Sequence, residues 1–348
     1  MDRFITIDIG GTDIKYGLME GKTVRFLEKG KRPTEAWLGG TGIVEKALDI
    51  ISSLTSNKEK ADGVCISSAG MVDTGRGRIF YSGPNIPDYA GTEFKTIIEE
   101  KTGLPCEIEN DVNCAGLAEA VLGAAKRRDS VLCLTVGTGI GGCFVWKGDV
   151  YHGHSGSGCE IGYMNLEGGQ FERLGAMSVL LRRVAEQKRQ ERTGGDTAAL
   201  GDMSRIWTGQ RIFEAAREGD PICVSEIDRM CDVLGKGIAN ICYVLNPEVV
   251  VLGGGVMAQK EYLYPRIRGA LDRYLIRSIA QETELTMARQ GNDAGMIGAY
   301  LHFQKMQRKR QGRGAAEACT SECTPECTPE ACAQKAGHRE GCRHRCAE

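Results

Sequence analysis

The feature that most constrains this sequence is a repeated plan of strand, glycine-rich turn and strand. Residues 4–18 run from an alternating apolar strand through GGTD into a second strand, and residues 131–145 repeat the plan around GTGIGG. Each segment is typical of a β-hairpin. One glycine turn is common, but two hairpins of the same design predict a duplicated architecture that holds a polyphosphate from both sides.

The first turn carries residues suited to binding phosphate. Adjacent Gly10 and Gly11 let backbone amides approach a bound group closely, and the Thr12 hydroxyl can donate a hydrogen bond. Asp8, at the end of the strand, can hold a hydrated magnesium ion. Taken alone, these residues fit an ordinary glycine turn equally well. The second turn is followed by a strand rather than a helix, which argues against a dinucleotide-binding fingerprint.

Asn110 and Asp111 stand where a short apolar run, residues 104–108, meets a helix rich in small residues. An acid at such a junction can cap the helix. It can also accept a proton from a ligand. Because the two hairpins bring phosphates toward this acid, we expect Asp111 to deprotonate a sugar hydroxyl.

Other loops offer further ligand-binding residues. Residues 61–73 predict a buried strand that ends in a loop of small residues, and Asn85 lies between two prolines, where its amide can pair with hydroxyls. Glu160 closes a glycine-rich loop. Glu172 begins a helical run, where it suits a helix N-terminus as well as a ligand. Residues 249–255 are a buried strand and three glycines, against which an adenosine can lie.

Length and charge narrow the class of protein. A chain of 348 residues exceeds what one hydrophobic core usually serves, so we expect two lobes with a site between them. Lys plus Arg number 44 and Asp plus Glu 46, a formal net charge of -2, which favours a small-molecule ligand over nucleic acid or a membrane surface. The first residues lead directly into a strand and no apolar run spans a bilayer, so we expect a cytoplasmic protein.

The 15 cysteines fall into two groups. Nine are scattered through apolar segments, and we expect these to be buried free thiols. The other six lie in the tail, where a basic run and the near-repeat EACTSECTPECTPEAC predict disorder over residues 307–348.

Six segments, in this order and spacing, resemble the ROK family of sugar kinases and sugar-responsive repressors. They are DIGGTDIKYG at residues 8–17, AGMVD at 69–73, NDVNCAGLAE at 110–119, VGTGIGG at 136–142, EIGY at 160–163 and VVLGGGV at 250–256. The resemblance implies an α/β fold of two lobes, actin-like and hexokinase-like (ribonuclease H-like), with the active site in the interlobe cleft. It also implies ATP with Mg²⁺, a homodimer, a small lobe of residues 1–117 plus 291–306 and a large lobe of residues 118–290.

By this resemblance, Asp111 is the general base that takes the proton from the sugar's primary (6-) hydroxyl as it attacks the γ-phosphate of ATP. Phosphoryl transfer depends mainly on positioning and charge neutralisation, so we expect an ordinary pKa for this carboxylate. The implied sugar-binding residues are Gly70, Asn85, Asn110, Glu160, Tyr163 and Glu172. The implied ATP-binding residues are Asp8, which also holds Mg²⁺ through water, Gly10, Gly11, Thr12, Lys15, Gly137, Thr138, Gly139, Gly254 and Gly255.

The sequence departs from the family pattern at two places. Many ROK kinases have His at the position of Tyr163, followed by a cysteine-containing zinc loop. Here residues 163–171 contain no cysteine, so we expect no structural zinc. The chain is more similar to the zinc-lacking branch of β-glucoside kinases and some N-acetylmannosamine kinases, in which Glu172 is implied to bind the sugar near its anomeric end. The second departure is Cys159, where a glycine is usual, and it bears on the shape of that loop.

Two other functions remain as alternatives to the sugar kinase. A ROK repressor would use the same sugar cleft to control DNA binding, but it needs a helix-turn-helix ahead of the first strand, which here begins at Phe4. Another actin-like ATPase would leave the AGMVD loop, Asn85 and the NDVN segment without a role. The sequence favours an ATP-dependent sugar kinase and does not distinguish a hexose, an N-acetylhexosamine and a β-glucoside as its substrate.

Overall fold

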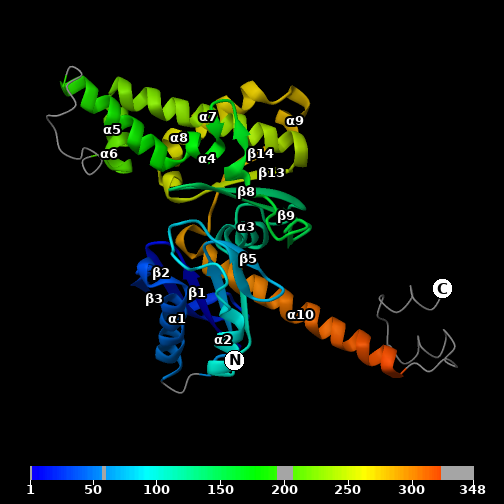
Figure 1. The fold of residues 1–348 in the computed structure, drawn as a ribbon. Coiled ribbons are helices and arrows are strands. Elements are labelled where there is room, and N and C mark those ends of the chain that lie inside the picture. Colours follow the sequence, from blue (N-terminus) through cyan, green and yellow to red (C-terminus); the bar gives the residue numbers. More distant parts are fainter. Residues whose placement is uncertain (1, 57–59, 194–206, 323–348) are drawn as a thin grey trace.

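The chain forms two α/β lobes, each built on a five-stranded mixed sheet (Figure 1). The computed structural model describes residues 2–56, 60–193 and 207–322. The first sheet has the order β3 (Arg25–Pro33), β2 (Asp13–Glu20), β1 (Arg3–Ile9), β4 (Gly63–Ser68) and β7 (Cys106–Asn110). The second has the order β10 (Asp149–Val150), β9 (Ile140–Trp146), β8 (Ser130–Val136), β13 (Val249–Gly253) and β14 (Glu284–Met287).

The two sheets repeat one connectivity. In the first, β1 pairs antiparallel with β2, and β1, β4 and β7 run parallel. In the second, β8 pairs antiparallel with β9, and β8, β13 and β14 run parallel. The predicted duplication of a glycine-turn hairpin is therefore confirmed. The register places Ile9 beside Ser68 and Ser68 beside Asn110, so the carboxyl ends of three parallel strands meet at one edge of the first sheet.

Helices cover both faces of the first sheet. Helix α1 (Gly39–Thr55) presents Ile43, Ala47, Ile50 and Leu54 to the core at helical spacing, and α2 (Phe94–Thr102) adds buried Phe94. Helix α10 (Ala294–Glu322) packs against β1, β4 and β7. The remaining elements of this lobe are η1 (Ala36–Leu38) and the hairpin of β5 (Met71–Asp73) and β6 (Arg78–Tyr81).

The second sheet is packed on both faces, and its side chains alternate accordingly. Leu132 and Leu134 of β8 join the large core beneath the upper helices, whereas Val131 and Cys133 face α3 (Asp111–Val121), which lies between the lobes (Figure 1). The upper helices are α4 (Phe171–Gly175), α5 (Met177–Thr193), α6 (Gly209–Arg217), α7 (Pro221–Leu245), α8 (Lys260–Tyr274) and α9 (Arg277–Glu282). Short elements complete the chain: η2 (Ile161–Tyr163), β11 (Asn165–Leu166), β12 (Gly169–Gln170), η4 (Gly255–Gln259) and η5 (Gly291–Asp293).

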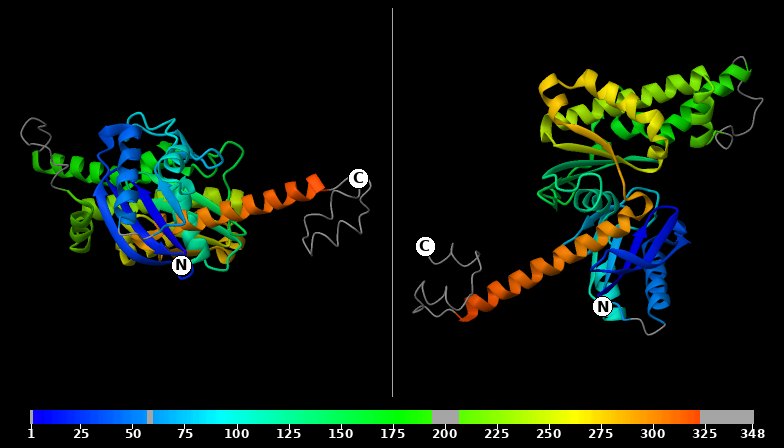
Figure 2. Two further views of the ribbon diagram at one scale, coloured as in Figure 1. Left: turned by 90° about the horizontal axis from the view of Figure 1, so that it is seen from below. Right: turned by 180° about the vertical axis from the view of Figure 1, so that it is seen from behind.

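Helix α10 differs from the sequence prediction at its C-terminal end. The sequence predicts disorder from residue 307, but the helix continues to Glu322 and extends away from both lobes (Figure 2). Ion pairs hold the start of this part of the helix to the fold: Arg310 Nη2 lies 2.6 Å from Glu107 Oε1, and Lys309 Nζ lies 3.8 Å from Asp149 Oδ1. The rest of the predicted tail lies outside the described residues.

The cysteines of the folded part behave as predicted. Nine free cysteines are present where the structure describes side chains, and all are buried except Cys159, which is half-buried. Within the described residues, no helix has both the length and the apolar character needed to cross a bilayer. The predicted residue boundaries of the two lobes stay a prediction.

Candidate active site

The junction between β7 and α3 places Asp111 at the first position of a helix. Asn110 caps that helix, because its side-chain oxygen accepts hydrogen bonds from the amides of Val112 (2.9 Å) and Asn113 (3.0 Å). Its amide group donates to the Gly70 carbonyl (2.9 Å) and to Asp111 Oδ1 (3.0 Å). Capping of the helix was the alternative role for Asp111, and Asn110 performs it instead. The Asp111 carboxylate is therefore available to accept a proton from a ligand.

The environment of Asp111 raises its pKa to about 7. Burial is the largest cause, and the charges of Asp8 and Glu160 add to it, while hydrogen bonds from backbone amides act in the opposite direction. Our expectation of an ordinary pKa is therefore wrong, because burial and two other carboxylates disfavour the charged form of Asp111. A carboxylate whose pKa lies near neutrality is well matched to accepting a proton as a general base.

Asp8 lies beside this base at the end of β1. Ser67 Oγ donates a hydrogen bond to Asp8 Oδ1 (2.6 Å), and Lys15 Nζ lies 3.5 Å from Oδ2. The backbone of α10 packs closely against the same carboxylate, since a Cβ added to Gly295 would overlap it. Oδ2 therefore has the weaker contact and can accept a hydrogen bond from a metal-bound water.

The turn between β1 and β2 is anchored from its carbonyl side by buried Thr34. The Thr34 hydroxyl donates to the Gly10 carbonyl (2.6 Å), and its amide donates to the Thr12 carbonyl (2.8 Å). Gly11 and Thr12 are exposed, and a Cβ added to Gly11 would meet nothing within 4 Å. The predicted phosphate turn is thus held in shape while its tip stays accessible to a ligand.

The turn between β8 and β9 lines a cavity of about 300 Å³. Helix α5 fixes this turn, because the Met177 amide donates to the Gly137 carbonyl (2.9 Å) and Ser178 Oγ donates to the Thr138 carbonyl (2.6 Å). The lining residues are Thr135, Gly137, Thr138, Gly139, Ile140, Gly141, Glu172 and Gly254. The lining therefore contains Gly137, Thr138 and Gly139, the three residues of the second hairpin that were predicted to bind ATP. It also contains Gly254, which was predicted to bind ATP from the strand β13 side.

Gly254 and Gly255 follow β13 and border two cavities. Gly254 has φ +92° and packs so closely on Val136 that an added Cβ would overlap its backbone, so only glycine fits. Gly255 lines a second cavity, of about 430 Å³. The other lining residues of this cavity are Met177, Gly209, Gln210, Phe213, Glu214, Arg217, Val256, Ala258 and Gln259. The larger cavity beside the phosphate turn suits the base and ribose of a nucleotide.

Residues predicted for the sugar come from both lobes. Partial desolvation and the charge of Glu172 raise the pKa of Glu160, so these two carboxylates are neighbours. Glu172 also borders the phosphate turn, since a Cβ added to Gly139 would lie 2.8 Å from Glu172 Oε2. Burial and a hydrogen bond with Tyr81 raise the pKa of Tyr163, and this contact joins β6 of the first lobe to η2 of the second.

Two loop positions bear on the predicted sugar contacts. Cys159 has φ +65°, a left-handed conformation that glycine adopts with less strain. Although Cys159 stands where the family usually has glycine, its backbone keeps the positive φ that glycine favours. Asn85 is exposed on the loop between β6 and α2, and its role in sugar binding stays a prediction.

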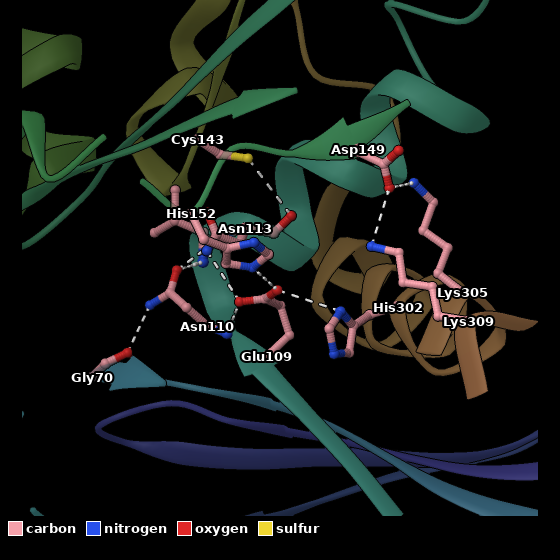
Figure 3. A network of polar contacts seen from close by, with 11 residues as sticks. Gly70, Glu109, Asn110, Asn113, Cys143, Asp149, His152, His302, Lys305 and Lys309 are labelled. Carbon is pink, nitrogen blue, oxygen red and sulfur yellow. Dashed lines mark hydrogen bonds and ion pairs between the residues drawn. The ribbon is translucent and has the colours of Figure 1, made fainter. Parts of the chain in front are cut away.

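The sequence analysis missed a buried polar group, Glu109, whose contacts with Asn113, His152 and His302 are drawn in Figure 3. Glu109 is fully buried, and its Oε1 accepts hydrogen bonds from the Asn110 amide (2.8 Å) and from Asn113 Nδ2 (3.0 Å). Its Oε2 lies 2.6 Å from His152 Nε2. A glutamate within a buried strand, two residues before the candidate base, is the signal that could have identified it.

Comparison with known proteins assigns this architecture to a family. The model of the ROK family matches residues 4–306. The chain belongs to the ROK family. A glucokinase from Halalkalibacterium halodurans is 31% identical over 85% of this chain and 93% of its own length. A β-glucoside kinase from Klebsiella pneumoniae is 30% identical over 88% of this chain and 97% of its own length.

A solved structure of the ROK family supports the same assignment. The crystal structure of a ROK family glucokinase from Streptomyces griseus, in complex with glucose and AMPPNP, is 30% identical and covers 86% of this chain and 98% of its own, with a TM-score of 0.72. The predicted two-lobed actin-like fold is therefore confirmed. Within the described residues, no group of three or more His, Cys, Asp or Glu side chains could hold a metal ion. The absence of a structural zinc stays a prediction.

Proposed function

We propose that this protein transfers the γ-phosphate of ATP to the 6-hydroxyl of a hexose, an N-acetylhexosamine or a β-glucoside, with Asp111 as the general base. The broader class rests on the comparisons: the chain is an ATP-dependent sugar kinase of the ROK family. The observation that carries the finer proposal is the setting of Asp111. Its raised pKa suits a base at neutral pH, and the charges of Asp8 in the first phosphate hairpin and of Glu160 in the sugar loop both act on it.

In the proposed mechanism, Asp111 accepts the proton of the sugar hydroxyl as the hydroxyl oxygen forms a bond to the γ-phosphorus. The bond from the γ-phosphorus to the bridging oxygen breaks, and ADP leaves with that oxygen. Backbone amides of the two glycine turns position the phosphates. Asp8 would hold Mg²⁺ through water, and the ion supplies neutralisation of the phosphate charge.

The proposed fit of Asp8 to Mg²⁺ follows from its contacts. Ser67 occupies Oδ1 at 2.6 Å, while Oδ2 has only the longer 3.5 Å approach of Lys15. A single carboxylate that contacts the ion through water is typical of magnesium in phosphoryl transfer, where phosphates supply the other oxygens. Lys15 would then balance the charge of the same carboxylate and of a phosphate.

The substrate is tested by measuring ADP release with glucose, mannose, fructose, N-acetylmannosamine, N-acetylglucosamine and cellobiose. We expect ADP release to require one of these sugars, and 6-deoxyglucose to inhibit a glucose-dependent reaction without being phosphorylated. Phosphorus NMR of the product identifies the modified hydroxyl. ATP hydrolysis at a similar rate without any sugar would contradict the proposal, as would a product phosphorylated at the anomeric oxygen.

We also propose a homodimer that works in the cytoplasm. Exposed apolar side chains lie at the C-terminal end of α7 (Val244, 81% exposed) and just before α9 (Ile276, 57% exposed), and these two segments are in contact, because the Ile276 amide donates to Tyr243 Oη (2.9 Å). A second copy of the chain could cover this surface. Light scattering should give twice the chain mass for the wild type and a smaller mass for Val244→Glu.

The proposed location in the cytoplasm is supported by the free cysteines, because buried free thiols fit a reducing compartment.

A further inference from the structure

We propose that Glu109 and His152 are positioning residues that couple the sugar loop, residues 152–160, to the catalytic junction at Asn110 and Asp111 (Figure 3). The inference rests on the proposed role of Asp111 as the base. It assigns no direct contact with substrate to either residue. What it adds is a physical connection between a loop of the second lobe and the end of a strand in the first.

One carboxylate oxygen of Glu109 holds the catalytic junction. Oε1 accepts hydrogen bonds from the backbone amide of Asn110 (2.8 Å) and from Asn113 Nδ2 (3.0 Å). It therefore fixes the residue before the base and the residue two positions after the base. Asn110 in turn donates to Asp111 Oδ1 at 3.0 Å. Glu109 is completely buried, which leaves these donors no competing water.

The other oxygen holds the sugar loop. Oε2 lies 2.6 Å from His152 Nε2, and the His152 carbonyl accepts the amide of Gly158 at 2.8 Å, which closes the loop on itself two residues before Glu160. A Cβ added to Gly158 would lie 2.6 Å from the Tyr151 carbonyl, so the loop ends pack tightly. A movement of His152 is therefore transmitted to Glu160 through the main chain.

The pKa shifts of the two partners favour the ionised form of the pair. The hydrogen bond that the charged form of His152 donates to the Glu109 carboxylate is the main reason that the pKa of His152 is raised. Burial raises the pKa of Glu109, but His152 and His302 outweigh it and the net shift is downward. Burial is the largest cause of a lowered pKa for His302, whose Nδ1 lies 3.4 Å from Glu109 Oε2.

Other charged groups face the two histidines, and they set the pH range of the coupling. Asp149 favours and Lys309 disfavours the charged form of His152, and Lys305 and Lys309 disfavour that of His302. Because the folded pKa of His152 is raised, its ionic contribution is complete below the unfolded value of about 6.5 and is lost as pH rises through the folded pKa. The coupling should therefore weaken on the alkaline side.

The test compares His152→Ala and His152→Gln with a matched control, His154→Ala, which removes an exposed histidine from the same loop. We expect His152→Ala to lower kcat/KM for the sugar by roughly 10- to 100-fold, the cost of misplacing reacting groups, while KM for ATP changes less than about twofold. His152→Gln keeps a donor that does not titrate. It should recover most of the loss and flatten the alkaline decline, and the control should match the wild type.

A double-mutant cycle with Glu109→Gln shows whether Glu109 and His152 act together or affect activity independently. If the pair acts as one unit, adding His152→Ala to Glu109→Gln should cost less than about twofold further, with thermal midpoints showing that each variant folds. The inference is overturned if His152→Ala behaves like His154→Ala, if KM for ATP rises as much as KM for the sugar, or if the two losses simply multiply. Retained turnover in Asp111→Asn would instead refute the base and leave these sugar-specific readouts interpretable.

Discussion

Replacing Asp111 with Asn tests the proposed mechanism most directly. The variant keeps the shape and an oxygen that can accept the Val112 amide, which lies 2.9 Å from Asp111 Oδ1, but it removes the base. A general base contributes roughly 10²- to 10⁴-fold to the rate, so kcat should fall by that factor. Since the pKa of Asp111 is about 7, about half of the wild-type carboxylates are protonated at neutral pH. The measured loss should therefore be about twofold larger one pH unit higher.

The assay is ADP release with the best sugar of the panel, combined with calorimetry of sugar binding. We expect the sugar dissociation constant of Asp111→Asn to stay within about tenfold of the wild type, because the shape of the site is kept. Asp272→Asn makes the same chemical change on α8, outside the candidate site, and should leave kcat unchanged. If Asp111→Asn retained kcat within about tenfold of the wild type, the reasoning that makes this residue the base would be refuted.

Three further predictions follow from single positions. The value of kcat/KM should fall as pH drops through about 7, because Asp111 acts only when deprotonated; a profile without an acidic limb there would contradict this. Gly254→Ala should lower the free energy of unfolding by at least ~1–2 kcal/mol in denaturant titrations, because φ is +92° and Val136 blocks the Cβ, whereas Gly255→Ala should stay within ~0.5 kcal/mol. Cys159→Gly should keep the thermal midpoint and the activity, while Cys159→Val should lower the midpoint, because a β-branched side chain fits poorly at φ +65°.

The sequence predicted the elements of the site better than their interactions. The two hairpins follow from alternating strands and glycine turns, and the junction at Asp111 follows from an apolar run that meets small residues. These signals are local, and the structure confirms the strands and the helix that they predict. The pKa of Asp111 could not be predicted in this way, because it depends on burial and on the charges of Asp8 and Glu160, which only the folded chain brings about.

The two glutamates of β7 also show why local sequence patterns do not predict interactions between distant segments. Glu107 and Glu109 alternate along β7 and both face α10, where Arg310 and His302 meet them. Read locally, two glutamates in a short apolar run look like exposed positions of an edge strand. Long-range packing makes them buried partners: helix α10, which begins at residue 294, contacts both glutamates, and His152 of the second lobe contacts Glu109. The ion pair of Arg310 with Glu107 also helps to explain why α10 continues where the composition predicted disorder.

The position of α3 determines how the two lobes can work together. A Cβ added to Gly141 of β9 would lie 2.5 Å from Val112, and one added to Gly298 of α10 would overlap Cys114, so α3 is packed tightly from both lobes. Asp111 begins this helix, and Asn110, which caps it, donates to Asp111 Oδ1 at 3.0 Å. Glu160 belongs to a loop of the second lobe, and its charge acts on Asp111. Closure of the lobes around a sugar should then change the distance from Glu160 to Asp111, and the Glu109–His152 contact limits how far that distance can open.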